Sequence, residues 1–271
     1  MIKINEKIVE LGNFPDGSML IKEAVPVGAS VTISWFYEND REFVALIYLV
    51  NHIKAHGCET IHLYMPYIPN ARQDRVKTGE DVFTLKYFAG VINSLGFKSV
   101  TVLDPHSNVS EALIDRIQVR KPTQYIQQAI ARITAIEGET PSMFYPDEGA
   151  GKRYSGMITL PYAFGIKKRD WQSGKILGLD VSGDVENIAG KNILIVDDIC
   201  SKGGTFCFSA KRLKELGAKN IYLHITHCEN TIFDGDLLNS GLIKRIYTTN
   251  SILTKTHEII EITELKENEN E

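Results

Sequence analysis

Helical and extended segments alternate along this sequence, and the alternation limits the chain to a small set of folds. Amphipathic stretches that end at a glycine are each followed by a short run rich in β-branched residues, and the first begins at Asn39 with Glu42 three residues later, the spacing of a capping box. Helices separated by short strands favour an α/β fold with a mainly parallel sheet covered on both faces. The expected elements are helices at 39–57, 81–96 and 205–217 and strands at 60–64, 99–103, 192–196 and 220–226.

Two of these helix–strand units resemble each other in detail. Residues 95–106 (LGFKSVTVLDPH) and 216–227 (LGAKNIYLHITH) both begin with Leu-Gly, continue through a strand and end at a histidine. We therefore expect two similar halves in tandem, 1–130 and 131–271. A last strand at about 257–264 is expected to pack back on the N-terminal half.

Composition argues against several classes of function. The 271 residues carry a net charge of −4, which gives no global electrostatic basis for binding nucleic acid. The first residues lack the apolar core of a signal peptide, and no apolar run reaches the ~20 residues of a membrane span. The four cysteines form no CxxC pair and are typical of reduced thiols. We expect a cytoplasmic protein with neither membrane nor nucleic acid as partner.

The stretch 195–205 (IVDDICSKGGT) carries the strongest chemical signal. An apolar strand leads into Asp197 and Asp198, a glycine pair allows a tight turn, and a helix begins near Thr205. Ligands of parallel sheets bind beyond the carboxyl ends of the strands, and a helix N-terminus attracts anions. Two carboxylates suit sugar hydroxyls or a divalent cation. The stretch therefore predicts a ligand with a phosphate and a diol, such as a phosphorylated ribose.

Three other interpretations of this stretch compete. A receiver domain would need more strands than the residues after Asp198 can supply, and a nucleotide hydrolase would carry a GxxxxGK[ST] motif upstream, which is absent from the sequence. A solvated turn that matches by chance is the third. The rest of the chain makes this last interpretation less attractive.

Five stretches together resemble one enzyme family. The segment ILIVDDICSKGGT is similar to the phosphoribosyl-diphosphate-binding motif of the phosphoribosyltransferase fold. Four others, in matching order, resemble motifs of the ribose-phosphate diphosphokinases, also called phosphoribosyl pyrophosphate synthetases: FPDGSMLIK (14–22), YIPNARQDR (67–75), LDPHS (103–107) and YPDEGAGKR (145–153). The resemblance implies two tandem phosphoribosyltransferase-like, Rossmann-like domains with mainly parallel sheets.

The resemblance also implies which residues of the first half act on ATP. Phe14 and Asp16 would contact the adenine of a neighbouring subunit, and His106 would help to hold Mg-ATP. A planar guanidinium in the ARQDR stretch is suited to bidentate contact with phosphate oxygens. The full set of ATP-binding residues expected from the family is Phe14, Asp16, Arg72, Gln73, Asp74 and His106.

In the second half the resemblance implies a sugar-phosphate site, a diphosphate loop and a catalytic pair. Asp147 would be a magnesium ligand together with His106. Lys168 aligns with a lysine of a mobile loop that stabilises the transition state, and Arg169 would replace an arginine that the family has where this chain has Asp170. The diphosphate loop is expected at Asp147, Glu148, Gly149 and Ala150, and the sugar phosphate at Asp197, Asp198, Ser201, Lys202, Gly203, Gly204 and Thr205.

The activity implied by the resemblance is transfer of a diphosphoryl group from Mg-ATP to the anomeric hydroxyl of ribose 5-phosphate, with release of AMP. Such chemistry depends on alignment and charge neutralisation more than on covalent help from the protein. Family members are homo-oligomers, so a dimer or a hexamer is expected here. His224 and His227, three residues apart on a predicted strand, would point to opposite faces and are assigned structural roles.

Four further residues depart from the family's pattern: Ser201-Lys202 stands in place of Asp-Thr, Ala150 in place of a glycine, and Ser18 in place of a glutamate. The exchange at 201–202 removes negative charge and adds positive charge, which favours a more anionic substituent on the 5-oxygen. ADP-ribose is such an acceptor, and its diphosphorylation would serve salvage of NAD. That activity is the alternative to the use of ribose 5-phosphate.

Two further alternatives belong to other classes. A non-catalytic regulatory homologue is disfavoured because Arg72, His106, Asp147 and Lys168 are all present. A phosphoribosyltransferase that transfers a glycosyl group would leave the ARQDR and LDPHS stretches unexplained.

Overall fold

The computed structural model describes residues 1–24, 28, 30–169 and 176–267, with the backbone alone at 167–169 and 176–178. Contacts divide the chain into unit 1, Met1–Lys121 with Lys266–Glu271, and unit 2, Pro122–Leu265. We expected the division at 130/131, within what the structure shows to be helix α4 (Thr123–Glu137). The division falls earlier because the apolar face of α4 packs entirely into the core of unit 2.

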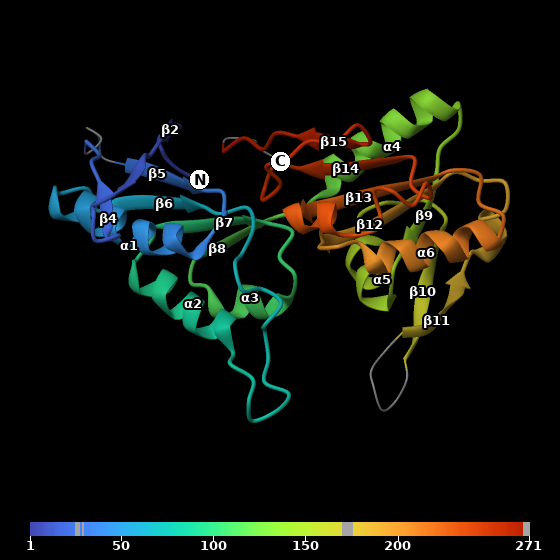
Figure 1. The fold of residues 1–271 in the computed structure, drawn as a ribbon, viewed down its shortest axis with the longest axis horizontal. Coiled ribbons are helices and arrows are strands. Elements are labelled where there is room, and N and C mark those ends of the chain that lie inside the picture. Colours follow the sequence, from blue (N-terminus) through green and yellow to red (C-terminus); the bar gives the residue numbers. More distant parts are fainter. Residues whose placement is uncertain (25–27, 29, 170–175, 268–271) are drawn as a thin grey trace. The chain divides into compact units, whose positions relative to one another are not determined.

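Unit 1 contains a six-stranded β-sheet with helices packed on it and a separate two-stranded hairpin (Figure 1). The sheet order is β2-β1-β5-β6-β7-β8, in which β5 to β8 are parallel and β1 runs antiparallel to both neighbours. The separate antiparallel hairpin joins β3 to β4. The elements are β1 (Ile2–Ile4), β2 (Lys7–Ile8), β3 (Leu11–Asn13), β4 (Met19–Ile21), β5 (Ser30–Trp35), α1 (Asp40–Ala55), β6 (Thr60–Tyr64), α2 (Thr84–Ser94), β7 (Ser99–Leu103), α3 (Asn108–Leu113) and β8 (Ile117–Arg120).

The core of unit 1 lies on one face of its sheet. Apolar residues of α1 and α2 pack in a single cluster with alternate residues of β5, β6 and β7. The opposite face presents the half-buried Thr32, His62 and Thr101 and buries Ser34, Tyr64 and Leu103 at the carboxyl ends of the strands. Because α1 and α2 both pack on the first face, the expectation of helices on both faces does not describe this unit.

The capping box predicted at the start of α1 is wrong. The Asn39 side chain makes no cap hydrogen bond, and Glu42 is directed to other partners. The buried carboxylate of Glu42 accepts hydrogen bonds from Trp35 Nε1 at 3.0 Å and from the backbone N–H of Glu38 at 2.9 Å. An indole N–H buried in the core requires an acceptor, and Glu42 supplies it.

Unit 2 contains a longer and mostly parallel sheet, with the order β11-β10-β9-β12-β13-β14-β15 (Figure 1). All its pairings are parallel except that of β10 with β11. The elements are α4 (Thr123–Glu137), β9 (Ser142–Tyr145), α5 (Glu148–Tyr154), β10 (Tyr162–Arg169), β11 (Ile176–Gly183), β12 (Ile193–Cys200), α6 (Gly204–Glu215), β13 (Ile221–Cys228), β14 (Arg245–Thr249) and β15 (Ile260–Thr263), with 3₁₀ turns at Val185–Asn187 and Asn230–Asp234.

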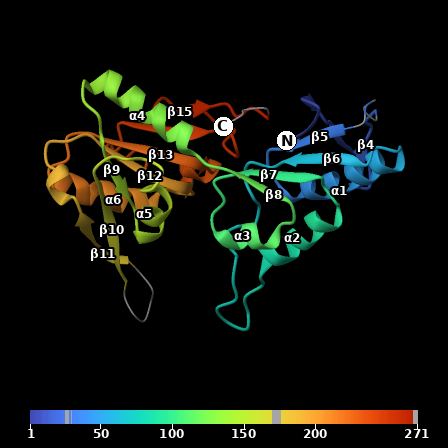
Figure 2. The same ribbon diagram turned by 180° about the vertical axis from the view of Figure 1, so that it is seen from behind.

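Helices cover both faces of the unit 2 sheet, as predicted. Residues of α6 pack in one core cluster with the sheet, and residues of α4 and α5 pack in another (Figure 2 shows these helices from behind). The repeated unit is also confirmed, because α2, Gly96 and β7 correspond in order to α6, Gly217 and β13. Both glycines have a positive φ that ends the helix.

Two strands of unit 2 differ from our expectations. Strand β12 does not end at residue 196 but continues to Cys200, so that Asp197 and Asp198 lie within it, paired with β13. Strand β15 pairs with β14 in unit 2 and not with the N-terminal half. Of the residues described after β15, Lys266 and Glu267 belong to unit 1, where Arg120 donates hydrogen bonds to their carbonyls.

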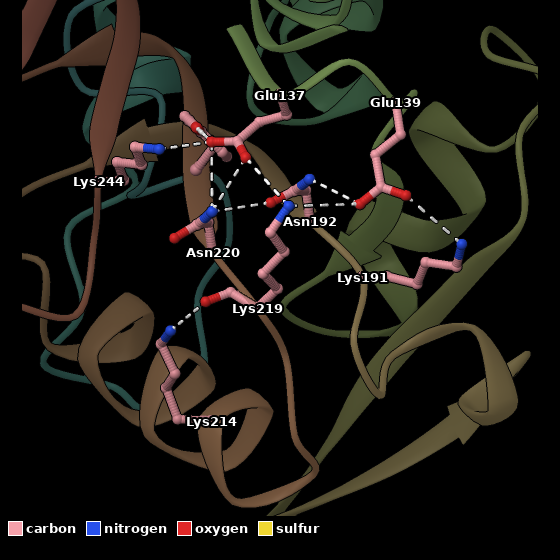
Figure 3. A network of polar contacts seen from close by, with 9 residues as sticks. Glu137, Glu139, Lys191, Asn192, Lys214, Lys219, Asn220 and Lys244 are labelled. Carbon is pink, nitrogen blue, oxygen red and sulfur yellow. Dashed lines mark hydrogen bonds and ion pairs between the residues drawn. The ribbon is translucent and has the colours of Figure 1, made fainter.

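A polar network ties the end of α4 to the amino ends of β13 and β14 (Figure 3). The Glu137 carboxylate accepts hydrogen bonds from Lys244, Tyr222 and Asn220, and it forms an ion pair with Lys219 at 3.4 Å. These partners, Lys244 first, lower the pKa of Glu137 to about 2. The network holds α4 on the sheet.

The described helices include none with the length and apolar character that a bilayer span requires.

Candidate active site

The ARQDR residues of unit 1 line a cavity of about 300 Å³ at the carboxyl edge of the sheet. Strands β6 and β7 are parallel neighbours, so the loops that follow them meet at one edge. The loop after β6 contributes most of the lining, and the loop after β7 contributes His106. The lining residues are Arg72, Gln73, Asp74, Arg75, Lys77, Asp81 and His106. The structure thus brings together four residues that the sequence assigned to ATP: Arg72, Gln73, Asp74 and His106.

Asp74 fixes the shape of this cavity. Its carboxylate is buried and accepts two hydrogen bonds from the Arg75 guanidinium, at 2.7 and 3.0 Å. The hydrogen bonds and the charge of Arg75 hold the pKa of Asp74 below its ordinary value. Asp74 is therefore a support for the loop, whereas Arg72 and Gln73 are exposed.

Two further contacts order the same loop. Gln73 accepts a hydrogen bond from the Thr84 hydroxyl at 2.7 Å, which links the loop to the first turn of α2. Asp81 accepts from the backbone N–H groups of Lys77 and Thr78, at 2.8 and 2.7 Å. These contacts leave the basic groups of Arg72, Arg75 and Lys77 around a small polar cavity, which suits a polyphosphate.

Phe14 and Asp16 lie in the turn of the β3–β4 hairpin, outside the cavity lining. Asp16 accepts hydrogen bonds from the Ser18 backbone N–H at 2.9 Å and the Ser18 hydroxyl at 2.7 Å, which lowers the pKa of Asp16. The Phe14 ring is 49% exposed. An exposed ring on a fixed turn is available for stacking.

In unit 2 the acidic pair lies at the carboxyl end of β12 and is joined by a third carboxylate. Asp198 is buried and its Oδ2 lies 3.1 Å from Nη1 of Arg153, on α5. Burial, together with the nearby carboxylates of Asp198 and Asp147, raises the pKa of Asp197 well above its ordinary value. The carboxylates lie close enough together to repel one another, so the cluster fits a cation or a group that donates hydrogen bonds.

Residues 147–150 form the first turn of a helix, although the sequence predicted a loop. Asp147 is the N-cap of α5 and accepts a hydrogen bond from the Ala150 backbone N–H at 3.0 Å. A Cβ on Gly149 would lie 3.2 Å from the Asp147 carboxylate. The Ala150 side chain is buried in the core beneath α5, so the departure from glycine serves packing. The role of Asp147, Glu148, Gly149 and Ala150 toward a diphosphate stays a prediction.

Residues 201–205 form the turn that we predicted between β12 and α6. Gly203 has φ +80 and is the N-cap of α6, which begins at Gly204. The first N–H groups of a helix have no partner within it and attract anions. The Thr205 hydroxyl lies in this first turn, and Lys202 is exposed at the turn. The arrangement suits a phosphate group.

Lys168 and Arg169 lie at the end of strand β10, where Lys168 pairs with Gly178 and Arg169 with Ile176 of β11. The sequence predicted a polar loop there, but the segment pairs as an antiparallel hairpin. The side chains of both residues, and all of Asp170, lie outside the described residues, so their catalytic role stays a prediction.

His224 and His227 are both buried in β13, in agreement with structural roles. Burial, with His227 nearby, lowers the pKa of His224 to about 3. His227 contacts the Ser251 hydroxyl at 2.8 Å.

The side chains available as metal ligands decide whether a metal ion can bind at these sites. Among the residues that the structure describes, no three histidine, cysteine or acidic side chains converge into a metal site of their own. Magnesium needs only one or two protein carboxylates when it keeps water and phosphate oxygens as ligands. The neighbouring carboxylates of Asp147 and Asp197 fit a cation of that kind.

Sequence reasoning did not assign several residues that the structure places at these sites. Lys77 and Asp81 line the unit 1 cavity, and their signal was membership of the same loop as Arg72. Arg153 is the last residue of the quoted YPDEGAGKR stretch, so it could have been considered as a partner for the acidic pair. Thr231 hydrogen bonds with Ser201 from a distant segment, for which the sequence carries no signal.

Comparisons with known proteins agree with the motifs. The protein family described as phosphoribosyl transferase domain matches residues 155–231. The chain is 30% identical over 266 residues to the ribose-phosphate pyrophosphokinase of Thermococcus kodakarensis. The aligned region covers 95% of this chain and 90% of that protein. It is 29% identical over 272 residues to the protein of the same name from Sulfolobus acidocaldarius, and that aligned region covers 96% of this chain and 88% of the other protein.

A solved structure supports the fold. The phosphoribosylpyrophosphate synthetase from Mycobacterium smegmatis superposes with a TM-score of 0.78 at 19% identity, over 95% of this chain and 86% of that chain. The α/β fold with phosphoribosyltransferase-like domains is therefore confirmed. With the motifs in matching order and the identity to the Thermococcus protein over nearly its full length, the chain belongs to the ribose-phosphate pyrophosphokinase family of diphosphotransferases.

Proposed function

We propose that this protein transfers a diphosphoryl group from ATP to the C1 hydroxyl of ribose 5-phosphate and releases AMP. The observation that carries the proposal is the sequence of groups along β12 and α6. An acidic cluster, in which burial and the neighbouring carboxylates raise the pKa of Asp197, is followed directly by a helix N-terminus that lacks any acidic residue in its first turn. Such a site matches a diol at one end of the ligand and a phosphate at the other.

The proposed roles follow from these groups. Asp197 and Asp198 accept hydrogen bonds from the 2- and 3-hydroxyls of ribose, and Arg153 keeps Asp198 in place. The 5-phosphate binds the backbone N–H groups of Gly203, Gly204 and Thr205 and the Thr205 hydroxyl. In the reaction the C1 oxygen forms a bond to the β-phosphorus of ATP and loses its proton. The bond between the β-phosphorus and the α–β bridging oxygen breaks, and AMP leaves.

ATP is proposed to bind in unit 1. Arg72, Gln73 and His106 line the cavity that would receive its phosphates, with Arg75 and Lys77 as further cations. The exposed Phe14 ring and Asp16 are proposed to hold the adenine of a neighbouring subunit in a homo-oligomer, either a dimer or a hexamer.

Magnesium is the proposed cofactor, with His106 and Asp147 among its ligands. When bound with ATP it neutralises phosphate charge and so assists attack on the β-phosphorus. Lys168 and Arg169 are proposed to stabilise charge on the transferred group. Because the four cysteines are all free thiols, we place the reaction in the cytoplasm.

ADP-ribose is the second candidate acceptor, and Lys202 favours it. The Lys202 ammonium is exposed at the anion-binding turn, and no carboxylate within the described parts of the chain pairs with it. A diphosphate substituent on the 5-oxygen would supply additional negative charge for this lysine. The product would be ADP-ribose 1-diphosphate, for the salvage of NAD.

Mass spectrometry of the products from ATP, magnesium and each acceptor tests the proposal. Ribose 5-phosphate should give AMP and phosphoribosyl diphosphate in equal amounts, and at a higher rate than ADP-ribose gives its own product. Faster turnover of ADP-ribose than of ribose 5-phosphate would make ADP-ribose the preferred acceptor and ribose 5-phosphate the second candidate. Absence of AMP with every 5-substituted ribose would overturn the proposal.

A further inference from the structure

A short segment of unit 2 packs directly against the anion-binding turn 201–204. This supporting segment, residues 229–237, follows β13 and includes the 3₁₀ turn Asn230–Asp234. Its Glu229 backbone N–H donates to the carbonyl of Cys200 at 2.8 Å, immediately before the turn. Ile232 and Leu237 anchor the segment in the core of unit 2.

The packing between the two segments leaves no room for additional atoms. A Cβ on Gly235 would lie 2.0 Å from the carbonyl oxygen of Lys202. Gly235 has φ −113, which any residue adopts, so glycine is required for space and not for backbone conformation. A Cβ on Gly203 would likewise lie 2.7 Å from the side chain of Leu237. The position of the turn is therefore fixed from the side of the supporting segment.

Three polar side chains, those of Ser201, Glu229 and Thr231, extend the contact between the turn and the supporting segment. The Thr231 hydroxyl donates to the Glu229 carboxylate at 3.0 Å, and the Ser201 and Thr231 hydroxyl oxygens lie 3.0 Å apart. A hydroxyl has one hydrogen, and that of Thr231 is given to Glu229. In the contact between the two hydroxyls Ser201 must therefore be the donor. The Ser201 oxygen then presents only lone pairs to a ligand.

We propose that Thr231, Glu229 and Gly235 are positioning residues for the anion-binding turn 201–204. Gly235 allows the supporting segment to hold the Lys202 carbonyl in place, and Thr231 with Glu229 directs the hydroxyl hydrogen of Ser201 away from the ligand. Ser201 then faces a donor, such as a sugar hydroxyl or a bound water, while phosphate oxygens face the N–H groups of α6. This assignment rests on the proposed function of the same site.

The first experiment removes one hydroxyl and keeps its shape. Thr231→Val should raise the KM for ribose 5-phosphate about fivefold, the effect of one lost hydrogen bond, and leave the KM for ATP unchanged. Thr231→Ser keeps the hydroxyl and should restore the wild-type KM. In a Ser201→Ala background the Thr231→Val change should have no further effect, because the proposed action passes through Ser201.

The second experiment fills the space between the segments. Gly235→Ala should raise the KM for ribose 5-phosphate at least about tenfold by displacing the turn, again with the KM for ATP unchanged. Gly156→Ala is the matched control, because a Cβ there has no neighbour within 4 Å, and it should behave as the wild type. The Thr231 series stands on its own if Gly235→Ala fails to fold.

Equal changes in both KM values, or an undiminished effect of Thr231→Val in the Ser201→Ala background, would overturn the proposal. An unchanged KM for ribose 5-phosphate in Thr231→Val and in folded Gly235→Ala would do so as well. If any of these results were found while the wild-type enzyme produced phosphoribosyl diphosphate, only the positioning role would be wrong, and the proposed function would stand. A wild-type enzyme without activity toward any ribose would instead contradict the proposed function.

Discussion

Two acidic clusters of unit 2 show opposite electrostatics. Glu137, at the amino ends of β13 and β14, is surrounded by donors that lower its pKa to about 2. Asp197, at the carboxyl end of β12, is half-buried, and desolvation together with the nearby Asp198 and Asp147 raises its pKa well above the ordinary value. The first carboxylate is surrounded by donors within the protein (Figure 3), whereas the second lies among other carboxylates.

The difference separates stability from function. A buried carboxylate with a complete set of donors stabilises the fold in its ionised form. Carboxylates that repel one another cost stability, and such a cluster is retained where a ligand supplies the missing donors or positive charge. We therefore expect substitutions at the two clusters to act in opposite directions.

Glu137→Gln should give a larger loss of stability than Glu139→Gln. The change removes the charge that pairs with Lys244 and Lys219 at a buried position, and we expect the free energy of unfolding to fall by about 2 kcal/mol. Activity per folded molecule should stay unchanged, since the network lies away from the carboxyl end of β12. Denaturant unfolding and AMP release, measured on one preparation, check both statements.

Glu139→Gln is the matched control for that substitution. Glu139 lies two residues further along, where it pairs with Lys191 at 3.6 Å and Lys219 at 3.9 Å and accepts a hydrogen bond from Asn192 at 2.9 Å, but its side chain is 36% exposed. An exposed ion pair contributes less than about 1 kcal/mol, so the loss should be much smaller. Equal losses for the two variants would mean that burial of Glu137 does not set its contribution.

The acid dependence of stability sharpens the comparison with a smaller effect. Glu137 titrates at about 2 when folded and near its ordinary 4.5 when unfolded, so its contribution is present above pH 4.5 and is lost as the pH falls toward 2. Asp197 has the opposite sign, because its raised pKa favours the folded state once it is protonated. Stability curves of wild type and Glu137→Gln between about pH 7 and pH 3 test this. Parallel curves would contradict the assignment to Glu137.

The strands and much of the candidate site could be predicted because apolar periodicity and local motifs determine them. Strands 60–64 and 99–103 have the predicted bounds, and the turn before α6 lies where the glycine pair indicated. Arg72 and His106 line one cavity because parallel strands bring their loops to the same edge. Local sequence is sufficient for features of this kind.

Features that depend on distant partners could not be predicted. Glu42 has the spacing of a capping box but binds the indole of Trp35, since a buried N–H has the stronger requirement for an acceptor. The stretch 165–178 was expected to be a loop, yet its described residues 165–169 and 176–178 pair as antiparallel strands through backbone hydrogen bonds. The contact of Gly235 with Lys202 likewise depends on tertiary packing alone.

Asp197→Asn tests the central claim most directly. Unfolding free energy and the rate of AMP release with ribose 5-phosphate should be measured together on this variant. We predict that the protein becomes more stable by about 1 kcal/mol, because repulsion among the carboxylates is relieved, and that AMP release falls at least about a thousandfold. A variant that is less stable than the wild type, or that still releases AMP at a comparable rate, would contradict the account.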